Sequence, residues 1–131
     1  MGVSKREDIV PAISAARDQG AKAMNVLSSP MLYLNRRIIL DYVEECRLPT
    51  IYQWPEMAEQ DGGFAAYGPR FTQIFRQRAR MVAKVLRGTK PADIPVEQPT
   101  SFELVFNLKT ASAIGHHIPT GLLLRADKVI E

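Results

Sequence analysis

The sequence predicts an α/β fold in which an open, mainly parallel sheet is flanked by helices. Two observations support this prediction. Amphipathic helical patterns alternate with short apolar segments along the chain, which is the element order of right-handed crossovers in a parallel sheet. Glycine or proline stands at most of the boundaries between these segments and ends them. With 131 residues, 46% of them apolar and 24% charged, the chain is long enough for one ordinary globular domain.

The first predicted helix starts at a capping box of Ser4 and Glu7 and ends at Gly20. Residues 23–27 then form an apolar segment typical of a short buried strand. A serine followed by proline at positions 29–30 starts the next helix, because proline is favoured just after a serine N-cap. This helix is expected to bury one stripe, made of Leu34, Ile38, Ile39, Tyr42, Val43 and Cys46.

The middle of the chain repeats the alternation. Residues 50–54 have the β-branched and aromatic content of a strand, and Pro55 opens a short helix. Residues 64–67 are a further short apolar strand with glycines on both sides. The amphipathic helix that follows over residues 72–87 ends at Gly88, where a left-handed cap belongs.

The last third of the chain is expected to cross back to the sheet. Three prolines keep residues 91–99 extended, without a ladder of their own. Residues 102–108 alternate between a strongly apolar and a mixed face, which suits an edge or near-edge strand. Residues 109–114 add one or two helical turns. Thr120 caps a last predicted helix, whose buried side consists of Leu122, Leu123, Ala126, Val129 and Ile130.

Three stretches also carry a resemblance to a known family, namely residues 67–69, 84–99 and 102–111. They resemble the C-terminal part of ABC transporter substrate-binding proteins of the tryptophan/tyrosine-type family, which have a type I periplasmic-binding fold. The similarity runs from about residue 4 to the end, with the order and spacing of every segment preserved. It covers roughly the last two-fifths of such a protein, so an export signal and a first lobe have no counterpart in these residues.

The resemblance implies three parts. Residues 1–68 form the α/β core of the second lobe, and residues 69–90 form a helix that belongs to the absent first lobe or to a dimer partner. Residues 91–131 supply the crossover, a strand and C-terminal helices that return to the second lobe. The implied function is solute binding for an ABC uptake system, with a small solute such as an amino acid held between two lobes and passed to a permease.

The resemblance also implies a periplasmic or membrane-associated location. In the sequence itself, Met1 to Arg6 is polar with no apolar core behind it, so no export signal is expected and the chain is cytoplasmic if expressed as written. No stretch approaches the roughly 20 apolar residues that a membrane span needs.

Candidate binding residues follow from the rule that ligands of open α/β sheets bind beyond the carboxyl ends of the strands. The rule selects Ser28, Ser29 and Met31 after the first strand, Tyr52, Gln53 and Trp54 at the second, and Tyr67 and Gly68 at the third. We expect all three strand ends to face one crevice, where the aromatic rings supply flat apolar area and the serines with nearby helix amides suit a carboxylate. Taken singly, Trp54 or Tyr67 is equally consistent with core or rim packing.

Other function classes find little support in the sequence. It has no nucleophile elbow, phosphate loop or metal-ligand spacing, so we predict a non-enzymatic binding protein without a cofactor. The formal charge of +3 is scattered without runs of like charge, which favours solvated helix faces over nucleic-acid binding. Cys46, the single cysteine, is expected to be a buried small hydrophobe. His116 and His117 are expected to be loop residues and not metal ligands.

The helix over residues 72–87 raises a physical difficulty if the first lobe is absent. Burying a large apolar side chain contributes about 1.5–3 kcal/mol, so leaving its stripe in water forfeits on the order of 10 kcal/mol. Three covers are open: the chain's own lobe, the same helix of a second copy, or a separately supplied first lobe. A homodimer is favoured because it needs no other gene product. The alternative function is therefore a stand-alone dimeric interaction module that kept the fold without transport.

Overall fold

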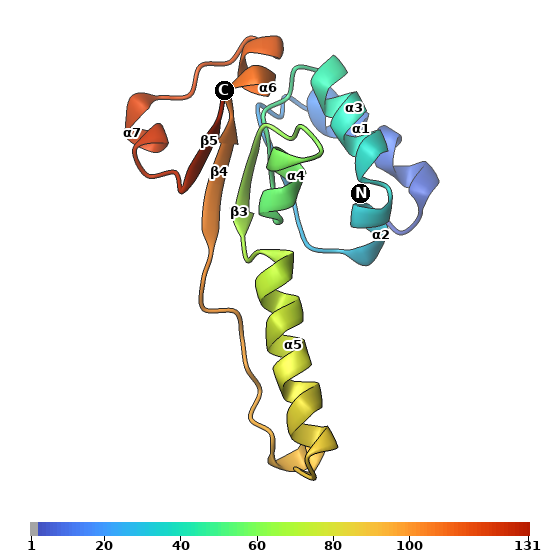
Figure 1. Cartoon of the computed structure of the whole chain (residues 1–131). Helices are drawn as coiled ribbons and strands as arrows, with labels where there is room; N and C mark the ends of the chain where they lie inside the picture. The colour runs from blue at the N-terminus through green and yellow to red at the C-terminus, as the bar shows by residue number, and fades with distance from the viewer. Residues whose placement is uncertain (1–2) are drawn as a thin grey trace.

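The structure, a computed structural model, describes residues 3–131. A body made of a sheet and its helices carries one long helix that projects away from it, and an extended segment returns alongside that helix (Figure 1). We call residues 71–101, which make up the helix and the returning segment, the arm. Met1 and Gly2, the start of the segment expected to lack an export signal, lie outside the described residues. Within residues 3–131, no helix combines the length and the apolar character needed to cross a membrane.

Five strands form one sheet in the order β1-β2-β3-β4-β5. They are β1 (Met24–Val26), β2 (Thr50–Tyr52), β3 (Ala65–Gly68), β4 (Glu103–Asn107) and β5 (Lys128–Ile130). The first three strands are mutually parallel, β4 is antiparallel to β3, and β5 is parallel to β4. The predicted open, mainly parallel α/β sheet is confirmed, and β4 lies next to the edge.

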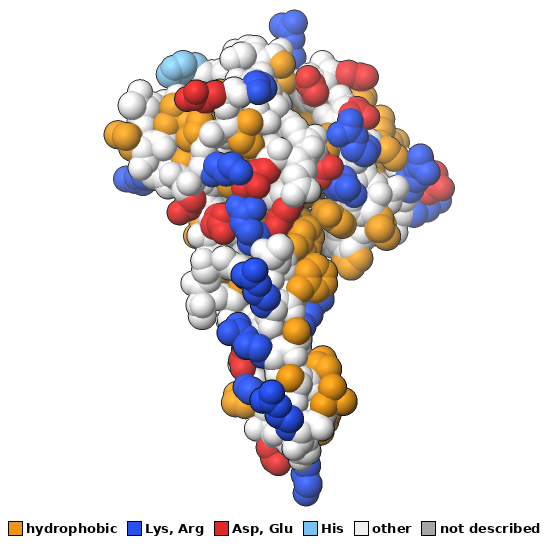
Figure 2. All heavy atoms as spheres, viewed as in Figure 1, with side chains coloured by type: hydrophobic (Ala, Val, Ile, Leu, Met, Phe, Trp, Pro, Cys, Tyr) orange, Lys and Arg blue, Asp and Glu red, His pale blue; other side chains and the backbone are white. Residues whose placement is uncertain are grey.

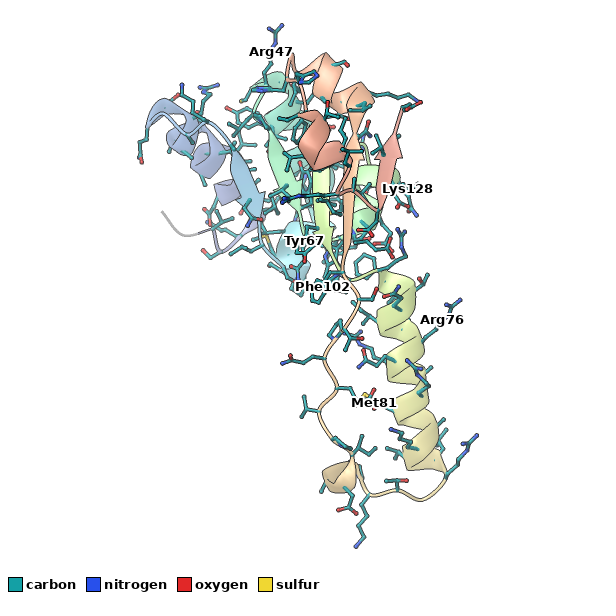
Figure 3. All side chains as sticks on the ribbon, turned by 90° about the vertical axis from the view of Figure 1, so that its left-hand side faces the viewer. Arg47, Tyr67, Arg76, Met81, Phe102 and Lys128 are labelled. Carbon is teal, nitrogen blue, oxygen red and sulfur yellow. The ribbon has the colours of Figure 1, made fainter. Side chains whose placement is uncertain are left out.

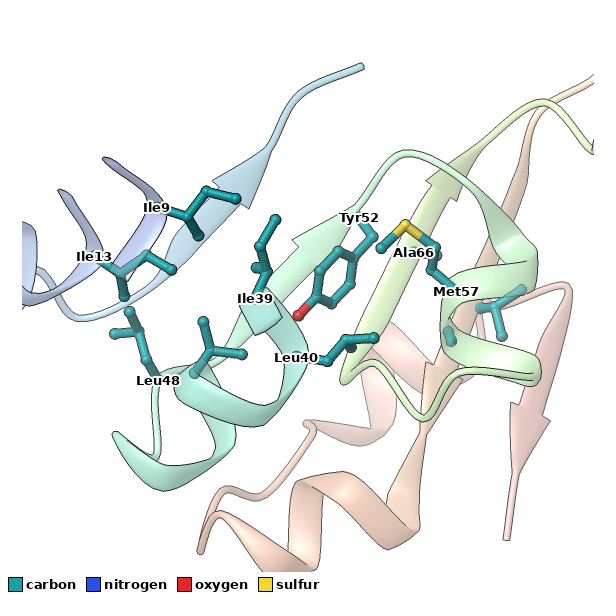
Figure 4. Close-up of a cluster of buried hydrophobic side chains, with 11 residues drawn as sticks. Ile9, Ile13, Ile39, Leu40, Leu48, Tyr52, Met57 and Ala66 are labelled. Atoms are coloured by element: carbon teal, nitrogen blue, oxygen red, sulfur yellow. The ribbon is translucent and has the colours of Figure 1, made fainter. Parts of the chain in front are cut away.

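Helices cover the sheet on both faces, except for α5 (Phe71–Leu86) and η2 (Pro91–Asp93), which belong to the arm. The others are η1 (Arg6–Asp8), α1 (Ile9–Asp18), α2 (Pro30–Leu34), α3 (Arg36–Glu45), α4 (Pro55–Glu59), α6 (Leu108–Ala113) and α7 (Thr120–Leu123). On one face, α1, α3 and α4 enclose the main core, in which Ile9, Ile39 and Tyr52 are buried (Figure 4). On the other face, a smaller cluster around Phe106 and Ile118 covers β3 and β4.

The first helix is capped differently from the prediction. Asp8, and not Glu7, accepts the free amides: its Oδ2 accepts hydrogen bonds from the backbone N–H groups of Ser4 and Lys5, each at 3.1 Å. The short 3-10 turn η1 precedes α1, so the acidic side chain that reaches back stands one residue later than a capping box beginning at Ser4 requires. The predicted Ser4–Glu7 pair is therefore wrong in its acidic member.

The helix predicted from residue 30 onward is broken at Asn35. Its backbone leaves the α-helical region (φ −103°, ψ 18°), and its side-chain Nδ2 donates a hydrogen bond to the carbonyl of Met31 at 2.8 Å. Such local side-chain bonds compete with a continuous helix. The break leaves Leu34 78% exposed, so its predicted burial is wrong, whereas Val43 is buried as predicted. Cys46 is only half-buried.

The last predicted helix is wrong beyond Leu123. The chain makes one short helix, α7, and then Val129 and Ile130 enter β5 beside β4. Asp127 fixes this junction, because its N–H donates to the Leu104 carbonyl at 2.8 Å and its Oδ2 accepts from the Leu104 N–H at 2.7 Å. Pairing with a distant strand thus overrides the helical spacing of the apolar residues, and β-branched side chains suit the strand.

Gly68 sets how closely the end of β3 approaches β2. A Cβ atom at this position would lie 1.8 Å from the backbone oxygen of Gln53, a distance that no side chain tolerates. Glycine is therefore required by the backbone contact between the two strand ends, and the two strands can converge there.

We expect Gly68→Ala to lower the free energy of unfolding by about 1–3 kcal/mol, the usual cost of overpacking a filled site. Chemical denaturation measures this change. Gly121→Ala is the matched control, because no atom lies within 4 Å of the added Cβ and the residue stands in α7. The control should be neutral or slightly stabilising. Equal stability of Gly68→Ala and the unchanged chain would contradict the steric argument.

Candidate functional site

A shallow hollow of about 280 Å³ lies at the carboxyl ends of β1, β2 and β3. We call it the strand-end hollow. It is lined by Asn25, Val26, Leu27, Ile51, Tyr52, Gln53, Tyr67, Gly68, Pro69 and Phe102. Register places Asn25 opposite Ile51 across the β1–β2 pair. Within the described chain its lining is aromatic and aliphatic, with two side-chain amides and no charged group.

The most exposed aromatic surface of the hollow comes from Tyr67 and Phe102. Their rings stack with centroids 5.8 Å apart and planes 27° apart, and the side chains remain 54% and 48% exposed. Figure 3 shows them together at the end of the sheet above the arm. Sequence reasoning missed Phe102, because its place beside Tyr67 depends on the antiparallel register of β3 and β4, in which Tyr67 pairs with Leu104.

Tyr52 borders the hollow, but its ring is buried on the opposite face of the sheet. The residue is 1% exposed, and its ring lies in the core near Ile39 and Leu40 (Figure 4). Among the described residues its hydroxyl has no hydrogen-bond partner, and burial raises the pKa of the phenol above its ordinary value. The Tyr52 side chain therefore belongs to the core and does not fit the predicted solute contact.

Trp54 faces the root of the arm and not Tyr67. Its ring stacks on Phe71 at 4.4 Å with a 23° angle between the planes, and Tyr33 meets Phe71 edge-on at 5.2 Å. Trp54 and Ser29 line a separate cavity of about 10 Å³. Aromatic packing thus holds the first turn of α5 against the body.

The structure therefore divides the predicted binding residues between two places. Tyr67 and Gly68 line the strand-end hollow, Ser29 and Trp54 line the small cavity, and Gln53 borders both. Ser28 is exposed and Met31 is half-buried against the core; neither lines the hollow. The three strand ends do border one hollow, as expected, but several of the predicted residues lie outside it, because consecutive strand residues point to opposite faces of a sheet.

Arg70 forms the main electrostatic contact at the root of the arm. Its Nη2 and Nη1 donate to the two carboxylate oxygens of Glu59 at 2.7 and 3.1 Å, and its Nε donates to Glu103 Oε1 at 3.0 Å. Glu59 also pairs with Lys128 at 3.4 Å. The hydrogen bonds that Arg70 donates hold the pKa of Glu59 below its ordinary value, and the bonds that it donates to Glu103 and Glu59 raise the pKa of Arg70. The network ties α4, β4 and β5 to the start of α5.

Beyond its first turn, α5 leaves the body and exposes its apolar stripe. No residue of α5 is buried, and Phe75, Val82 and Leu86 are 59%, 57% and 82% exposed. The returning segment contacts the helix through Glu97, whose carboxylate accepts hydrogen bonds from Lys84 at 3.2 Å and from Gln77 at 3.3 Å. Three partners were considered for the apolar stripe of this helix. The first of them, the chain's own body, is therefore wrong.

The arm is also strongly basic. It holds six cationic side chains, at positions 76, 78, 80, 84, 87 and 90, and two carboxylates, at 93 and 97. Its net charge of +4 exceeds the +3 of the whole chain, so the body is slightly acidic. Figure 2 shows these cations gathered along the arm beside hydrophobic side chains. The sequence showed the charges scattered without a run of like charge. In the structure, the cationic side chains at these six positions lie together on the arm.

A sequence profile of the ABC transporter substrate binding protein family matches residues 1–130. The chain belongs to this family. Its members are solute-binding proteins that normally work in the periplasm or outside the cell. No curated protein sequence matches the chain.

Solved structures share the fold. A structure described as the ABC domain in complex with L-Trp from Streptococcus pneumonia has a TM-score of 0.87 and 24% identity, covering 99% of this chain and 43% of the other. A conserved domain protein from Vibrio cholerae gives 0.86 and 24%, covering 95% and 42%. The ligand-free, open CD0873 of Clostridium difficile, a substrate binding protein with adhesive properties, gives 0.62 and 18%, covering 100% and 43%. The chain thus spans less than half the length of these structures.

We expect Arg70→Met to lower the free energy of unfolding by about 1.5–3 kcal/mol at neutral pH, because it removes hydrogen bonds between charged groups. The pKa of Glu59 is depressed in the folded chain, so its contribution is present above the unfolded value of about 4.3 and is lost as the pH falls through the folded value. The difference in the free energy of unfolding between Arg70→Met and the unchanged chain should therefore shrink below about pH 4. Denaturant titrations across this range measure it.

Arg37→Met is the control for a surface pair. Arg37 lies 3.7 Å from Asp41, with both side chains about two-thirds exposed, so the change should stay within about 0.5 kcal/mol at any pH. A loss for Arg70→Met that matches this control would show that the Arg70 network contributes nothing to the arm root.

Proposed function

We propose that the chain acts as one lobe of a solute-binding protein for an ABC uptake system, and that the strand-end hollow is its share of a cleft for a small solute such as an amino acid. The observation that carries the proposal is the exposed stack of Tyr67 and Phe102 at the carboxyl ends of the strands, beside the root of the arm. Exposed aromatic rings next to a few amides are typical of small-molecule sites.

The proposed mechanism requires a second lobe that packs on α5 and closes over the hollow. In this scheme residues 1–68, together with the strands and helices that follow the crossover within residues 91–131, provide one lobe, while residues 69–90 and the crossover beside them work with the other. Closure would bend the two crossings near Pro69 and Ser101 and bring the second lobe against Tyr67. Because the hollow itself is uncharged, the second lobe would supply the partners for a charged solute. The closed protein would then present the solute to a permease.

The exposed stripe of α5 favours a second candidate, a homodimer in which two copies of α5 pack antiparallel and serve as an interaction module. Phe75, Val82 and Leu86 would meet their symmetry mates, while the cations of the arm would lie at the rim. Two arms of charge +4 repel each other, so this dimer should tighten as added salt screens the repulsion. A second lobe with acidic groups opposite the arm meets no such penalty.

We expect aromatic or branched amino acids to bind the isolated chain weakly, with dissociation constants of about millimolar, because one lobe offers only part of the contacts. Titration followed by nuclear magnetic resonance should shift the signals of Tyr67 and Phe102, with a smaller change in the fluorescence of Trp54 at the neighbouring arm root. Tyr67→Ala should weaken binding by about tenfold, equal to about 1.4 kcal/mol.

Leu124→Ala serves as the control, because this side chain is 82% exposed and lies outside the hollow. It should leave both the spectra and the affinity unchanged. Saturable binding that is equal in Tyr67→Ala and the parent would remove the hollow from the proposal, and no response to any amino acid at tens of millimolar (an order of magnitude) would oppose a retained solute site.

We expect the chain without a second lobe to sediment as a dimer at about micromolar concentration, with more dimer at high salt. Replacing Phe75 and Val82 together with glutamate puts charge into the seam and should give monomers or aggregates. As a control, glutamate at Arg76 and Arg80 lowers the like-charge repulsion at the rim and should keep or strengthen the dimer. A well-folded monomer of the unchanged chain under all salt conditions would exclude the homodimer.

A further inference from the structure

Helix α4 holds the first residues of α5 with two carboxylates. Glu56 Oε1 accepts a hydrogen bond from the Phe71 N–H at 3.0 Å, and Glu59 accepts two from the Arg70 guanidinium, the shorter at 2.7 Å. Glu56 and Glu59 stand three residues apart, so both side chains leave the same face of the helix. Met57, which is buried in the main core, anchors α4 to the sheet. The two carboxylates therefore tie the arm to the body.

The same guanidinium also binds the returning chain. Arg70 Nε donates to both carboxylate oxygens of Glu103, at 3.0 and 3.1 Å, so one side chain joins the outgoing crossing, α4 and the start of β4. The Glu59 side chain is only 11% exposed, and salt screens such sheltered pairs weakly. Because hydrogen bonds tolerate little change in distance or angle, the arm cannot turn at Pro69 without breaking these contacts.

The stacked rings of Tyr67 and Phe102 lie on the opposite face of the sheet from α4. Ala66 packs with α4 in the main core, whereas Ala65 and Leu104 pack in the smaller cluster on the other face. Side chains alternate along a strand, so Tyr67 shares the face of Ala65, and Phe102 shares that of Leu104. A tilt of the arm toward the stacked rings therefore draws the start of α5 away from α4.

We propose that Glu56, Glu59 and Arg70 form a latch that holds the arm tilted away from the Tyr67–Phe102 stack, and that closure over a solute has to break this latch. The latched chain is then the open state, and a solute closes the protein only as far as its binding repays the broken contacts. The closure rests on the proposed function. The latch itself is a property of this chain and is measured without solute, so the failure of one proposal can be told from the failure of the other.

Spin labels at the tip of the arm and on both faces of the body test the latch. Arg87→Cys marks the tip, Leu124→Cys the face of the stacked rings and Asp41→Cys the face of α3 and α4; all three sites are exposed, and Cys46→Ser removes the native thiol. With 16 residues at about 1.5 Å each, α5 is about 24 Å long, so a small tilt moves its tip by several ångströms. Pulsed electron double resonance measures each distance from the tip to the body in the full chain. Dilution with unlabelled chain removes distances between two copies.

Both distance distributions should be narrow when the latch is intact. Glu56→Ala combined with Arg70→Met should broaden them, adding shorter distances to the label at 124 and longer ones to the label at 41, because the arm is then free to tilt toward the stacked rings. Glu56→Gln should keep both distributions narrow, since its amide oxygen still accepts the hydrogen bond from the Phe71 N–H.

Glu97→Ala is the matched control. It removes a carboxylate whose hydrogen bonds, to Gln77 and Lys84, lie within the arm, so both distances from the tip to the body should stay unchanged. Circular dichroism confirms that each variant is folded. Unchanged distributions in the folded double variant, a broad distribution in the chain with an intact latch, or a tilt toward the label at 41 would each overturn the latch.

Hydrogen exchange gives a second measurement that needs no label. The Phe71 amide should exchange at least about tenfold faster in Glu56→Ala than in the unchanged chain, because it loses its acceptor on α4. Equal exchange rates in the two proteins would show that Glu56 does not hold the start of α5, and the latch would then be wrong.

Discussion

The antiparallel pairing of β3 with β4 is the contact on which the rest of the structure depends. The chain leaves the sheet after β3 and returns to it at β4, at the same end of the sheet. The pairing of these two strands therefore closes the arm at its base. It brings Phe102 against Tyr67 and sets Glu103 within reach of Arg70. It also places β4 where β5 can add in parallel. Without it, the residues beyond the arm would have no sheet to return to.

Much of the fold follows from local patterns in the sequence. The four inner elements that glycine or proline delimits, β2, α4, β3 and α5, stand within one or two residues of their predicted positions. Two of the errors have different causes, one a strand pairing distant in sequence and the other a side-chain hydrogen bond between residues four apart. Val129 and Ile130 have helical spacing, yet strand pairing claims them, and the Asn35 side chain breaks a helix whose apolar stripe continues through it. The strand pairing has no signal in the local pattern, whereas the break does, because an asparagine side chain can compete with a continuous helix.

The candidate site was predictable only in part, because strand phase and contacts between residues distant in sequence decide which side chains line it. The rule of strand carboxyl ends selected Tyr67 and Gln53, which do line the hollow. It could not tell which face of the sheet each residue joins, because a shift of one residue in strand phase exchanges the two faces. Tyr52 and Trp54 were assigned to the hollow although their rings lie elsewhere. Phe102 was missed because it is far from Tyr67 in the chain.

The tip of the arm has a consequence for how the protein tolerates change during evolution. Gly88, at a φ of 100°, and the turn of η2 lie at the far end of the arm, where every residue from 84 to 93 is exposed. Doubling the length of a flexible loop costs only about 0.6 kcal/mol in closure entropy, and the base of the arm is fixed independently by Arg70 and Phe71. Insertions and deletions at this tip are therefore nearly neutral for the body, so related chains are free to vary the reach of the arm while they keep the same sheet.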